Sequence, residues 1–589
     1  MTLTSLDWSI VAMYFLLVLI VGLVVSKKAG SSVSEFFLSG RNMPWWLLGV
    51  SMVATTFSAD TPNLVTGLVR EDGVAGNWAW WAMLLTGMLT VFVYAKLWRR
   101  SMVLTDVEFY ELRYSGRPAA FLRGFRALYL GLVFNVVVMG AVSLAAVKFG
   151  EIVLGMPGWL TLLIAGSITL AYSAFGGLKA VVITDFVQFV LAMIGSVWAC
   201  IYLLNLDEVG GISGLLQHEN VIDKTALLPD FSNPSIWVPV LLVPLAVQWW
   251  ASYYPGSEPG GGGYIAQRMF SAKDEKNAIG ATLFFNVAHY ALRPWPWILI
   301  ALASLVIFPE LSDIQSVFPT LSEDKLGHDV AYPAMLTKLP PGLLGLVAAS
   351  LIAAFMSTIS TQLNLGASYL VNDFYKRFLK PDASEKQMVR VAQLFTVISA
   401  VMGLGLGLLL TDAGQAFRLL LLLGAGTGLI YILRWFWWRI SAMTEIVAMI
   451  VSLLIASYFT FAKHTFEDWQ TIVIGAFLTT LVWVLTTFLT PPTDDTTLRR
   501  FYRKIKPGGP GWDAVIAKAN AEGDTIVKES GNLPLEILCM LIGSITVYAA
   551  LFATGNWIYG ATSLAIGLTL LCAAGGSFLF WAWKKLQTE

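Results

Sequence analysis

Four small or hydroxyl-bearing residues recur at helical spacing in one apolar stretch of the chain. Ala354, Ser357, Thr358 and Thr361 stand at i, i+3, i+4 and i+7, so a helix here carries them on one face. A dehydrated hard cation such as sodium needs about five or six oxygens, and hydroxyls with main-chain carbonyls supply them without excess charge. Small side chains also let helices pack closely. The pattern alone leaves cation binding and tight helix packing both open.

Two other apolar stretches are interrupted by residues that break a helix. SADTP occupies residues 58–62, and PGSEPGGGG occupies residues 255–263. Lipid cannot hydrogen-bond freed N–H and C=O groups, so irregular backbone at membrane depth must be buried in protein or line a watery cavity. Paired interruptions in the two halves of a chain indicate the binding site of a secondary transporter. We therefore expect a solute or an ion to bind at the interruptions.

A carboxylate and a guanidinium fall inside apolar spans. Asp185 stands near the start of one span and Arg293 near the middle of another, where each is costly without a partner. Asp185 must therefore face a cavity, a cation or another partner, and a structural hydrogen bond with hydroxyls of the 354–361 helix would meet this need. The expected partner of Arg293 is Asp60 at the first interruption, Glu258 at the second, or an anionic solute.

The span that contains Arg293 has one polar face, because Asn286, His289, Tyr290 and Arg293 recur at i, i+3, i+4 and i+7. Aromatic residues gather at the start of the 77–97 span and around the second interruption, where they can stack on a sugar ring, form a gate or lie in an interfacial belt. These aromatic residues are Trp78, Trp80, Trp81, Tyr253, Tyr254 and Tyr264. We predict that RWFWWR at 434–439 is an interfacial belt.

Composition identifies a polytopic membrane protein. Hydrophobic residues make up 57% of the 589 residues and charged residues 13%. With about 20 apolar residues per span, we expect about fifteen spans. They are 8–27, 45–70, 77–97, 121–150, 157–174, 179–205, 236–254, 279–308, 341–371, 388–411, 416–438, 441–463, 469–490, 534–554 and 557–583. The composition gives no support for a nucleic-acid partner, and the scattered histidines and apolar-embedded cysteines argue against an enzyme.

Lysine and arginine gather in alternate gaps between the spans, and such gaps face the cytoplasm. This pattern, in which we counted Arg268 with a basic gap, predicts an outside N-terminus and a cytoplasmic C-terminus. Residues 8–27 lack a basic leader, so we expect a retained span rather than a signal peptide.

The interrupted spans cross the membrane in opposite senses. Counting the second span as core helix 1, the interruptions lie in core helices 1 and 6, as in a five-plus-five inverted repeat. We predict an all-α fold with one leading and about four trailing helices. The expected divisions are a leading helix and inner loop at 1–44, a first repeat at 45–205, a second repeat at 236–438, and trailing helices at 441–589 with the cytoplasmic loop 491–533.

Three stretches resemble a known family, the sodium:solute symporters, which include carriers of sugars, proline, pantothenate and sialic acid. YSAFGGLKAVVITDFVQF at 172–189 resembles the family signature that leads into core helix 5. AAFMSTISTQLN at 353–364 resembles its core helix 8, and MVATTFSADTP at 52–62 resembles its interrupted core helix 1. The resemblance covers roughly residues 8–440 and implies a bacterial member with a LeuT-type fold.

The resemblance also implies ion sites. The sodium site shared across the family would use the main-chain oxygens of Ala54, Phe57 and Ala354 with the hydroxyls of Ser357 and Thr358. A second sodium site, found in members that couple two ions, would use Asp185, Ser357, Ser360 and Thr361.

For the solute, sugar carriers of this family use a basic residue of core helix 7, and His289 or Arg293 is its counterpart. The chain departs from those carriers at Thr61 and Pro62, where they place a glutamine after the helix 1 acid. The solute-binding candidates are Ser58, Asp60, Thr61, Trp81, Tyr254, Glu258, Tyr264, Asn286, His289, Arg293 and Thr427.

We therefore expect a sodium-coupled symporter that imports a small polar organic solute, sugar-like or carboxylate-bearing, by alternating access. A solute-sensing receptor or an uncoupled carrier on the same fold is the alternative. The expected partners are sodium, the solute and the lipid bilayer, with no cofactor besides the coupling ion. We expect a monomer in the bacterial inner membrane.

Overall fold

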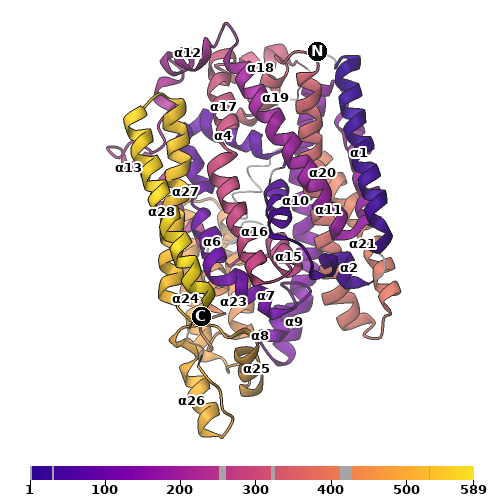
Figure 1. The fold of residues 1–589 in the computed structure, drawn as a ribbon, viewed down its shortest axis with the longest axis vertical. Coiled ribbons are helices and arrows are strands. Elements are labelled where there is room, and N and C mark those ends of the chain that lie inside the picture. The colour runs from indigo at the N-terminus through magenta and orange to yellow at the C-terminus, as the bar shows by residue number, and fades with distance from the viewer. Residues whose placement is uncertain are drawn as a thin grey trace.

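The computed structural model describes residues 3–29, 32–56, 58–250, 260–319, 321, 326–410, 427–528 and 531–588. Helices run along a common long axis, and the two chain ends lie toward opposite ends of the bundle (Figure 1). Ten helices of this described part are long and apolar enough to cross a membrane. They span Val74–Ser101, Gly116–Leu154, Gly176–Leu204, Glu275–Ile307, Leu343–Leu379, Glu385–Leu409, Ala442–Thr460, Asp468–Leu489, Leu533–Ile558 and Thr562–Lys585.

Core helix 1 is interrupted where SADTP predicts it. α3 (Trp45–Thr56) ends before this segment, and α4 (Thr61–Asp72) begins at its fourth residue. Pro62 stands in the first turn of α4, where its missing N–H would have no helical partner in any case. The last four carbonyl groups of α3 likewise have no partner within their own helix. The interruption therefore leaves acceptors inside the bundle.

Core helix 6 is interrupted as well. Its first half comprises α13 (Pro234–Trp237), a π-helical stretch (Val238–Leu242), α14 (Val243–Ala246) and a short turn (Gln248–Trp250). Its second half is α15 (Gly263–Ser271). Gly260 and Gly261 precede α15 with φ of +83° and +76°, a backbone region that favours glycine. Tyr254 and Glu258, two of the solute candidates, lie outside the described residues.

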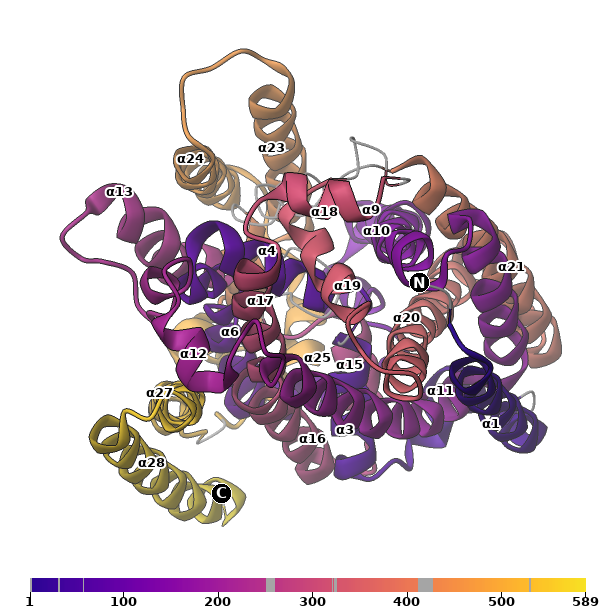
Figure 2. The same ribbon diagram turned by 90° about the horizontal axis from the view of Figure 1, so that it is seen from above.

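α20 (Leu343–Ser368), which forms core helix 8, lies at the centre of the bundle. The apolar window of this span is 94% buried, against 6% for the trailing α28 (Thr562–Thr588). The alanine, serine and threonine residues of α20 permit such close packing. Seen from above, long helices from distant parts of the chain stand beside it (Figure 2). They are α1 (Ser5–Ala29), α10 (Asn135–Phe149), α11 (Gly158–Leu204) and α21 (Glu385–Leu409).

α11 contains two of the predicted spans. Gly177 has φ of +57° and ψ of −167°, which is not helical, so core helices 4 and 5 meet there without a long loop. Asp185 lies beyond this kink, in core helix 5. Core helices 2, 3 and 7 are each assembled from shorter pieces. Core helix 2 contains α5 (Trp78–Trp81), α6 (Leu84–Leu89) and α7 (Ala95–Ser101), core helix 3 contains α9 (Gly116–Leu128) and α10, and core helix 7 contains α16 (Glu275–Val287) and α17 (Trp295–Ile307).

Short helices connect the spans at both ends of the bundle. They are α2 (Val33–Leu38), α8 (Phe109–Arg113), α12 (Gly211–Gln217), α18 (Leu311–Val317) and α19 (Ala331–Leu336).

The trailing helices lie on the periphery, with α25 (Asp495–Ile505) and α26 (Asp513–Ala521) at one end of the bundle (Figures 1 and 2). The other trailing helices are α23 (Ala442–Phe461), α24 (Asp468–Leu489), α27 (Leu533–Ile558) and α28. α27 packs on core helices 2 and 7: Tyr548 donates a hydrogen bond to the Trp81 carbonyl at 2.8 Å, and Trp295 donates to the Leu551 carbonyl at 3.0 Å. α27 thereby stabilises one side of the core, although it is distant in sequence from core helices 2 and 7.

The prediction of an interfacial belt at 434–439 is wrong for Trp435. Trp435 is fully buried, and its ring centroid lies 4.7 Å from that of Trp98 and 4.4 Å from that of Phe109. Its main-chain carbonyl also accepts a hydrogen bond from the indole of Trp512 at 2.9 Å. The sequence pattern missed this contact because residues 510–512 reach it only through the tertiary fold.

Candidate functional site

The hydroxyl face of α20 meets the C-terminal end of α3. Thr358 Oγ1 donates to the main-chain oxygen of Thr55 at 3.0 Å. Ala54 and Ala354, whose carbonyl oxygens the family resemblance assigns to a sodium site, are buried in these two helices. Ser357 stands one residue before Thr358 and is fully buried. The remaining predicted ligand of that site, Phe57, lies outside the described residues.

Asp185 receives two hydroxyl hydrogen bonds. Ser51 Oγ donates to its Oδ2 at 2.5 Å, and Ser357 Oγ donates to its Oδ1 at 2.6 Å. The carboxyl group is fully buried, and a buried carboxylate requires hydrogen-bond donors or a cation. The hydrogen bond expected from a hydroxyl of core helix 8 is therefore present.

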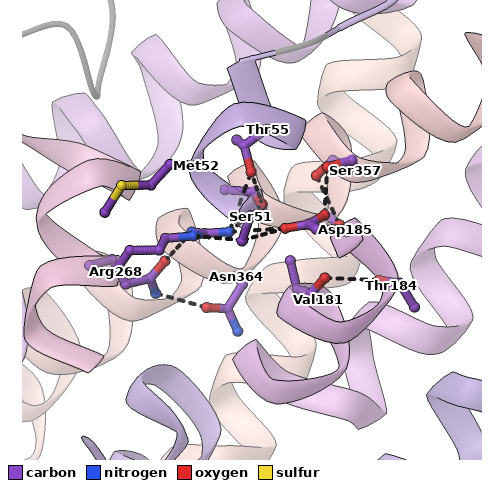
Figure 3. A network of polar contacts seen from close by, with 12 residues as sticks. Ser51, Met52, Thr55, Val181, Thr184, Asp185, Arg268, Ser357 and Asn364 are labelled. Carbon is purple, nitrogen blue, oxygen red and sulfur yellow. Dashed lines mark hydrogen bonds and ion pairs between the residues drawn. The ribbon is translucent and has the colours of Figure 1, made fainter. Parts of the chain in front are cut away.

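The cation beside Asp185 is Arg268, whose side chain crosses the site from α15 (Figure 3). Arg268 Nη2 lies 3.6 Å from Asp185 Oδ2, and both side chains are fully buried. Four hydrogen bonds hold the guanidinium: Nε donates to Ser51 Oγ at 3.2 Å, and Nη1 donates to Gln267 Oε1 at 3.0 Å. Nη2 donates to Thr361 Oγ1 at 2.9 Å and to Thr55 Oγ1 at 3.4 Å. One buried group thus joins core helices 1, 5, 6 and 8.

We missed Arg268 as a site residue in the sequence. Because a basic residue between spans ordinarily marks a cytoplasmic gap, we counted it there, and the structure shows that this placement is wrong. α15 continues core helix 6 into the bundle, and its residues at 264–266 and 269–270 are buried. Their apolar character on both sides of Arg268 is the signal that would have placed it inside.

The remaining members of the predicted second sodium site lie in the same network. Thr361 Oγ1 accepts from Arg268 and is 3.2 Å from Thr55 Oγ1. Ser360 Oγ donates to the main-chain oxygen of Ser357 at 3.0 Å. The structure therefore brings all four residues together around Asp185, and the second sodium site itself stays a prediction.

Arg293 binds the carbonyl groups at the end of α3. Its Nη1 donates to Val53 O at 2.9 Å, and its Nη2 donates to Thr56 O at 3.2 Å. A cation at this position also counters the negative end of the helix dipole. The charge of Arg293 acts on Asp60 as well, so this predicted partner lies within electrostatic range. Arg293 therefore fixes the geometry of the interruption.

Two of the solute candidates organise the turn between α3 and α4. Thr61 Oγ1 donates to the carbonyl oxygen of Thr56 at 3.3 Å and accepts from the main-chain N–H of Ser58 at 3.2 Å. These bonds satisfy backbone groups that the interruption frees.

Core helices 2 and 7 bring other solute candidates together. The His289 ring stands edge-on to Trp80 with centroids 5.4 Å apart, and Trp80 stacks on Tyr290 at 5.7 Å. Asn286 Oδ1 and His289 Nδ1 are buried and make no hydrogen bond among the described residues. A Cβ added to Gly87 would lie only 1.9 Å from Asn286 Oδ1. The helices approach this closely because residue 87 is glycine.

The other candidates are also buried. Trp81 is fully buried and its Nε1 has no hydrogen-bond partner within the described segments, so an interfacial belt is excluded for this residue. Tyr264 is buried in α15 within electrostatic range of Arg268. Thr427 is buried in the described part of core helix 10.

Paired interrupted helices around a buried hydroxyl face define a secondary transporter. The family model described as "SSF: Sodium:solute symporter family" matches residues 36–452, and the chain belongs to this family. It is a family of transporters, not enzymes, and the chain is an integral membrane protein with a LeuT-type inverted-repeat fold. The match ends before α24, so the last trailing helices lie beyond it.

Three similar proteins show what kind of relatives the chain has. A sodium/glucose cotransporter of Vibrio parahaemolyticus is 26% identical over 512 residues, which cover 84% of this chain and 92% of that protein. A human sodium/myo-inositol cotransporter is 27% identical over 442 residues, covering 68% of this chain and 58% of that protein. The solved structure of a Na+-coupled sialic acid symporter aligns with a TM-score of 0.68 at 21% identity, covering 83% and 99% of the two chains. This last likeness concerns the fold.

Proposed function

We propose that the chain is a sodium-coupled symporter that imports a small polar organic solute by alternating access. The contact of Thr358 with the Thr55 carbonyl carries the proposal, because it joins the hydroxyl face of core helix 8 to the open end of α3. Sodium would bind between the oxygens of Ala54, Phe57, Ala354, Ser357 and Thr358. The ion would replace the hydrogen bond between Thr358 and Thr55, because oxygens of both α3 and α20 would bind it.

Sodium bound there would order α3 against α20 and so favour the conformation that holds solute at the interruptions. By linkage, solute would raise the affinity for sodium by the same factor. One charge crossing 100 mV releases about 2.3 kcal/mol, and a tenfold sodium gradient adds about 1.4 kcal/mol. The sum of about 3.7 kcal/mol per ion sustains a solute gradient of a few hundredfold.

The solute site we propose lies between the two interruptions and core helices 2, 7 and 10. Among the described residues, the buried polar atoms there that lack a hydrogen-bond partner include atoms of three neutral groups, Trp81 Nε1, Asn286 Oδ1 and His289 Nδ1. Such donors and acceptors suit a hydroxyl-bearing solute, and the Trp80 ring beside them offers an apolar face for a sugar ring. Arg293 donates to carbonyls of α3, which favours a neutral, sugar-like solute over a carboxylate. The glucose and inositol cotransporters among the relatives agree with this chemistry.

The orientation and setting are also part of the proposal. We infer an outside N-terminus, a cytoplasmic C-terminus, a monomer and a bacterial inner membrane from the charge pattern and the family resemblance. The loops assigned to the cytoplasm, including α25 and α26, gather at one end of the bundle, which agrees with a single sidedness (Figure 1).

The test is the thermal stability of the purified protein against a panel of sugars, polyols, sialic acids, amino acids and carboxylates, each in sodium and in potassium. A ligand of the folded state stabilises by mass action. A shift for one sugar or polyol that requires sodium supports symport. Solute stabilisation equal in both salts would indicate an uncoupled carrier or a receptor, and a shift only with carboxylates would overturn the neutral-solute assignment.

A further inference from the structure

We propose that the Arg268 guanidinium is a built-in cation at the predicted second sodium site, and that the chain therefore couples one sodium ion per solute. The inference rests on the proposed sodium symport and specifies its stoichiometry. It follows from the contacts of one buried side chain rather than from the sequence pattern, which predicted an ion beside Asp185.

Arg268 contacts two of the four residues predicted to bind a second sodium ion, Asp185 and Thr361. Its Nη2 donates to Thr361 Oγ1 and lies 3.6 Å from the Asp185 carboxylate, and its Nε donates to Ser51 Oγ. Ser51 in turn donates to Asp185 at 2.5 Å. A second ion would have to displace these hydrogen bonds or share the same oxygens with the guanidinium.

Charge balance gives a second reason. Within the described segments, Asp185 is the carboxylate that pairs with Arg268, and both groups are fully buried. The pair is neutral, so an added sodium ion would give two cations to one carboxylate. Two like charges a few ångströms apart repel more strongly in a buried site than in water, because the effective dielectric constant is lower. This repulsion disfavours simultaneous occupancy by Arg268 and a second sodium ion.

Gln267, the residue before Arg268 in α15, helps to fix the position of the arginine. The neighbouring Gln267 accepts from Arg268 Nη1 at 3.0 Å and donates through Nε2 to Asn364 Oδ1 at 2.9 Å. α15 is thereby tied to α20 beside the guanidinium. The arginine is held in this network by hydrogen bonds to several helices, not by the ion pair alone.

The shared sodium site is compatible with this arrangement. Ser357 Oγ gives its hydrogen to Asp185 at 2.6 Å, which leaves the oxygen lone pairs as acceptors. The Arg268–Asp185 pair therefore orients Ser357 as a ligand for an ion on its other side, next to Thr358. The Arg268 guanidinium thus occupies the predicted second sodium site, and the oxygens of the shared site next to it stay available to a sodium ion.

Equilibrium binding of radioactive sodium to the purified full-length protein tests the inference with the ion alone. We expect one sodium per protein and a titration with a Hill coefficient near 1. Arg268→Gln leaves the Asp185 carboxylate without its cation, so this variant should bind two ions. Two saturable sodium ions in the unaltered protein would overturn the inference while leaving sodium coupling intact. No sodium binding at all would instead contradict the proposed function.

Two further variants keep the result interpretable. Asp185→Asn with Arg268→Gln removes both charges together, which avoids the large penalty of leaving one buried charge alone, and should bind one ion. A second ion in this double variant would overturn the role given to the Asp185 charge. Arg123→Gln is the matched control, because Arg123 pairs with buried Asp373 at 2.7 Å outside this network. It should leave the count at one, and a count of two would contradict a local effect of Arg268.

Discussion

Replacing Thr358 with valine should weaken sodium binding without changing the shape of the side chain. The substitution removes the hydroxyl that reaches the Thr55 carbonyl at 3.0 Å and that we propose as a sodium ligand. A hydrogen bond to a charged partner contributes about 1.5–3 kcal/mol, so we take about 2 kcal/mol for the lost ion contact. At about 1.4 kcal/mol per decade, the sodium concentration for half-maximal effect should rise roughly 30-fold.

The assay is the melting temperature of the purified protein against sodium concentration, with potassium keeping the ionic strength constant. Thr358→Ser retains the hydroxyl and should shift the midpoint by less than about threefold. Thr169→Val is a control for losing a buried threonine hydroxyl elsewhere, because Thr169 Oγ1 donates to the carbonyl of Ala165 at 2.7 Å in core helix 4. An unchanged sodium midpoint in a folded Thr358→Val protein would refute the assignment of this hydroxyl to the ion.

Three other predictions concern the pH dependence of stability, the affinity for solute, and the packing of α27 on core helix 2. Burial, with the nearby charges of Arg70 and Lys224, lowers the pKa of His328 in the folded protein below its usual 6.5. Protonation of His328 therefore favours the unfolded chain, and stability is lost as the pH falls below 6.5. The melting temperature should fall with acid, and His328→Gln should reduce this pH dependence. Gly87→Ala should raise the half-maximal solute concentration at least tenfold while sodium-only stabilisation persists, since the added Cβ collides with the amide opposite. Tyr548→Phe should lower the free energy of unfolding by about 1 kcal/mol in denaturant melts, because a buried carbonyl of core helix 2 loses its donor.

The interruptions and the hydroxyl face were predictable because they depend on local chemistry. Pro62 lacks a backbone N–H, and the glycines at 260–263 allow positive φ, so both disfavour a continuous helix wherever they stand. The spacing of Ser357 and Thr358 places them on one helix face. The structure then supplied what local patterns cannot: the contact of that face with the Thr55 carbonyl.

The partners of the buried charges were not predictable in the same way. Arg293 was expected to meet a carboxylate or an anionic solute, and it donates hydrogen bonds to carbonyl groups at the end of α3. Arg268 was counted with the basic gaps, although it is fully buried beside Asp185. In both cases the partner comes from a helix distant in sequence, so only the packing of the interrupted helices reveals it.

Sodium-driven accumulation tests the central claim most directly. The protein would be reconstituted in liposomes, and uptake of the solute that stabilises it in the thermal panel would be followed under an inward sodium gradient and under an equal potassium gradient. Symport predicts accumulation above the external concentration with sodium alone and its collapse when the sodium gradient is dissipated. Uptake that only equilibrates, at the same rate in both salts, would contradict it.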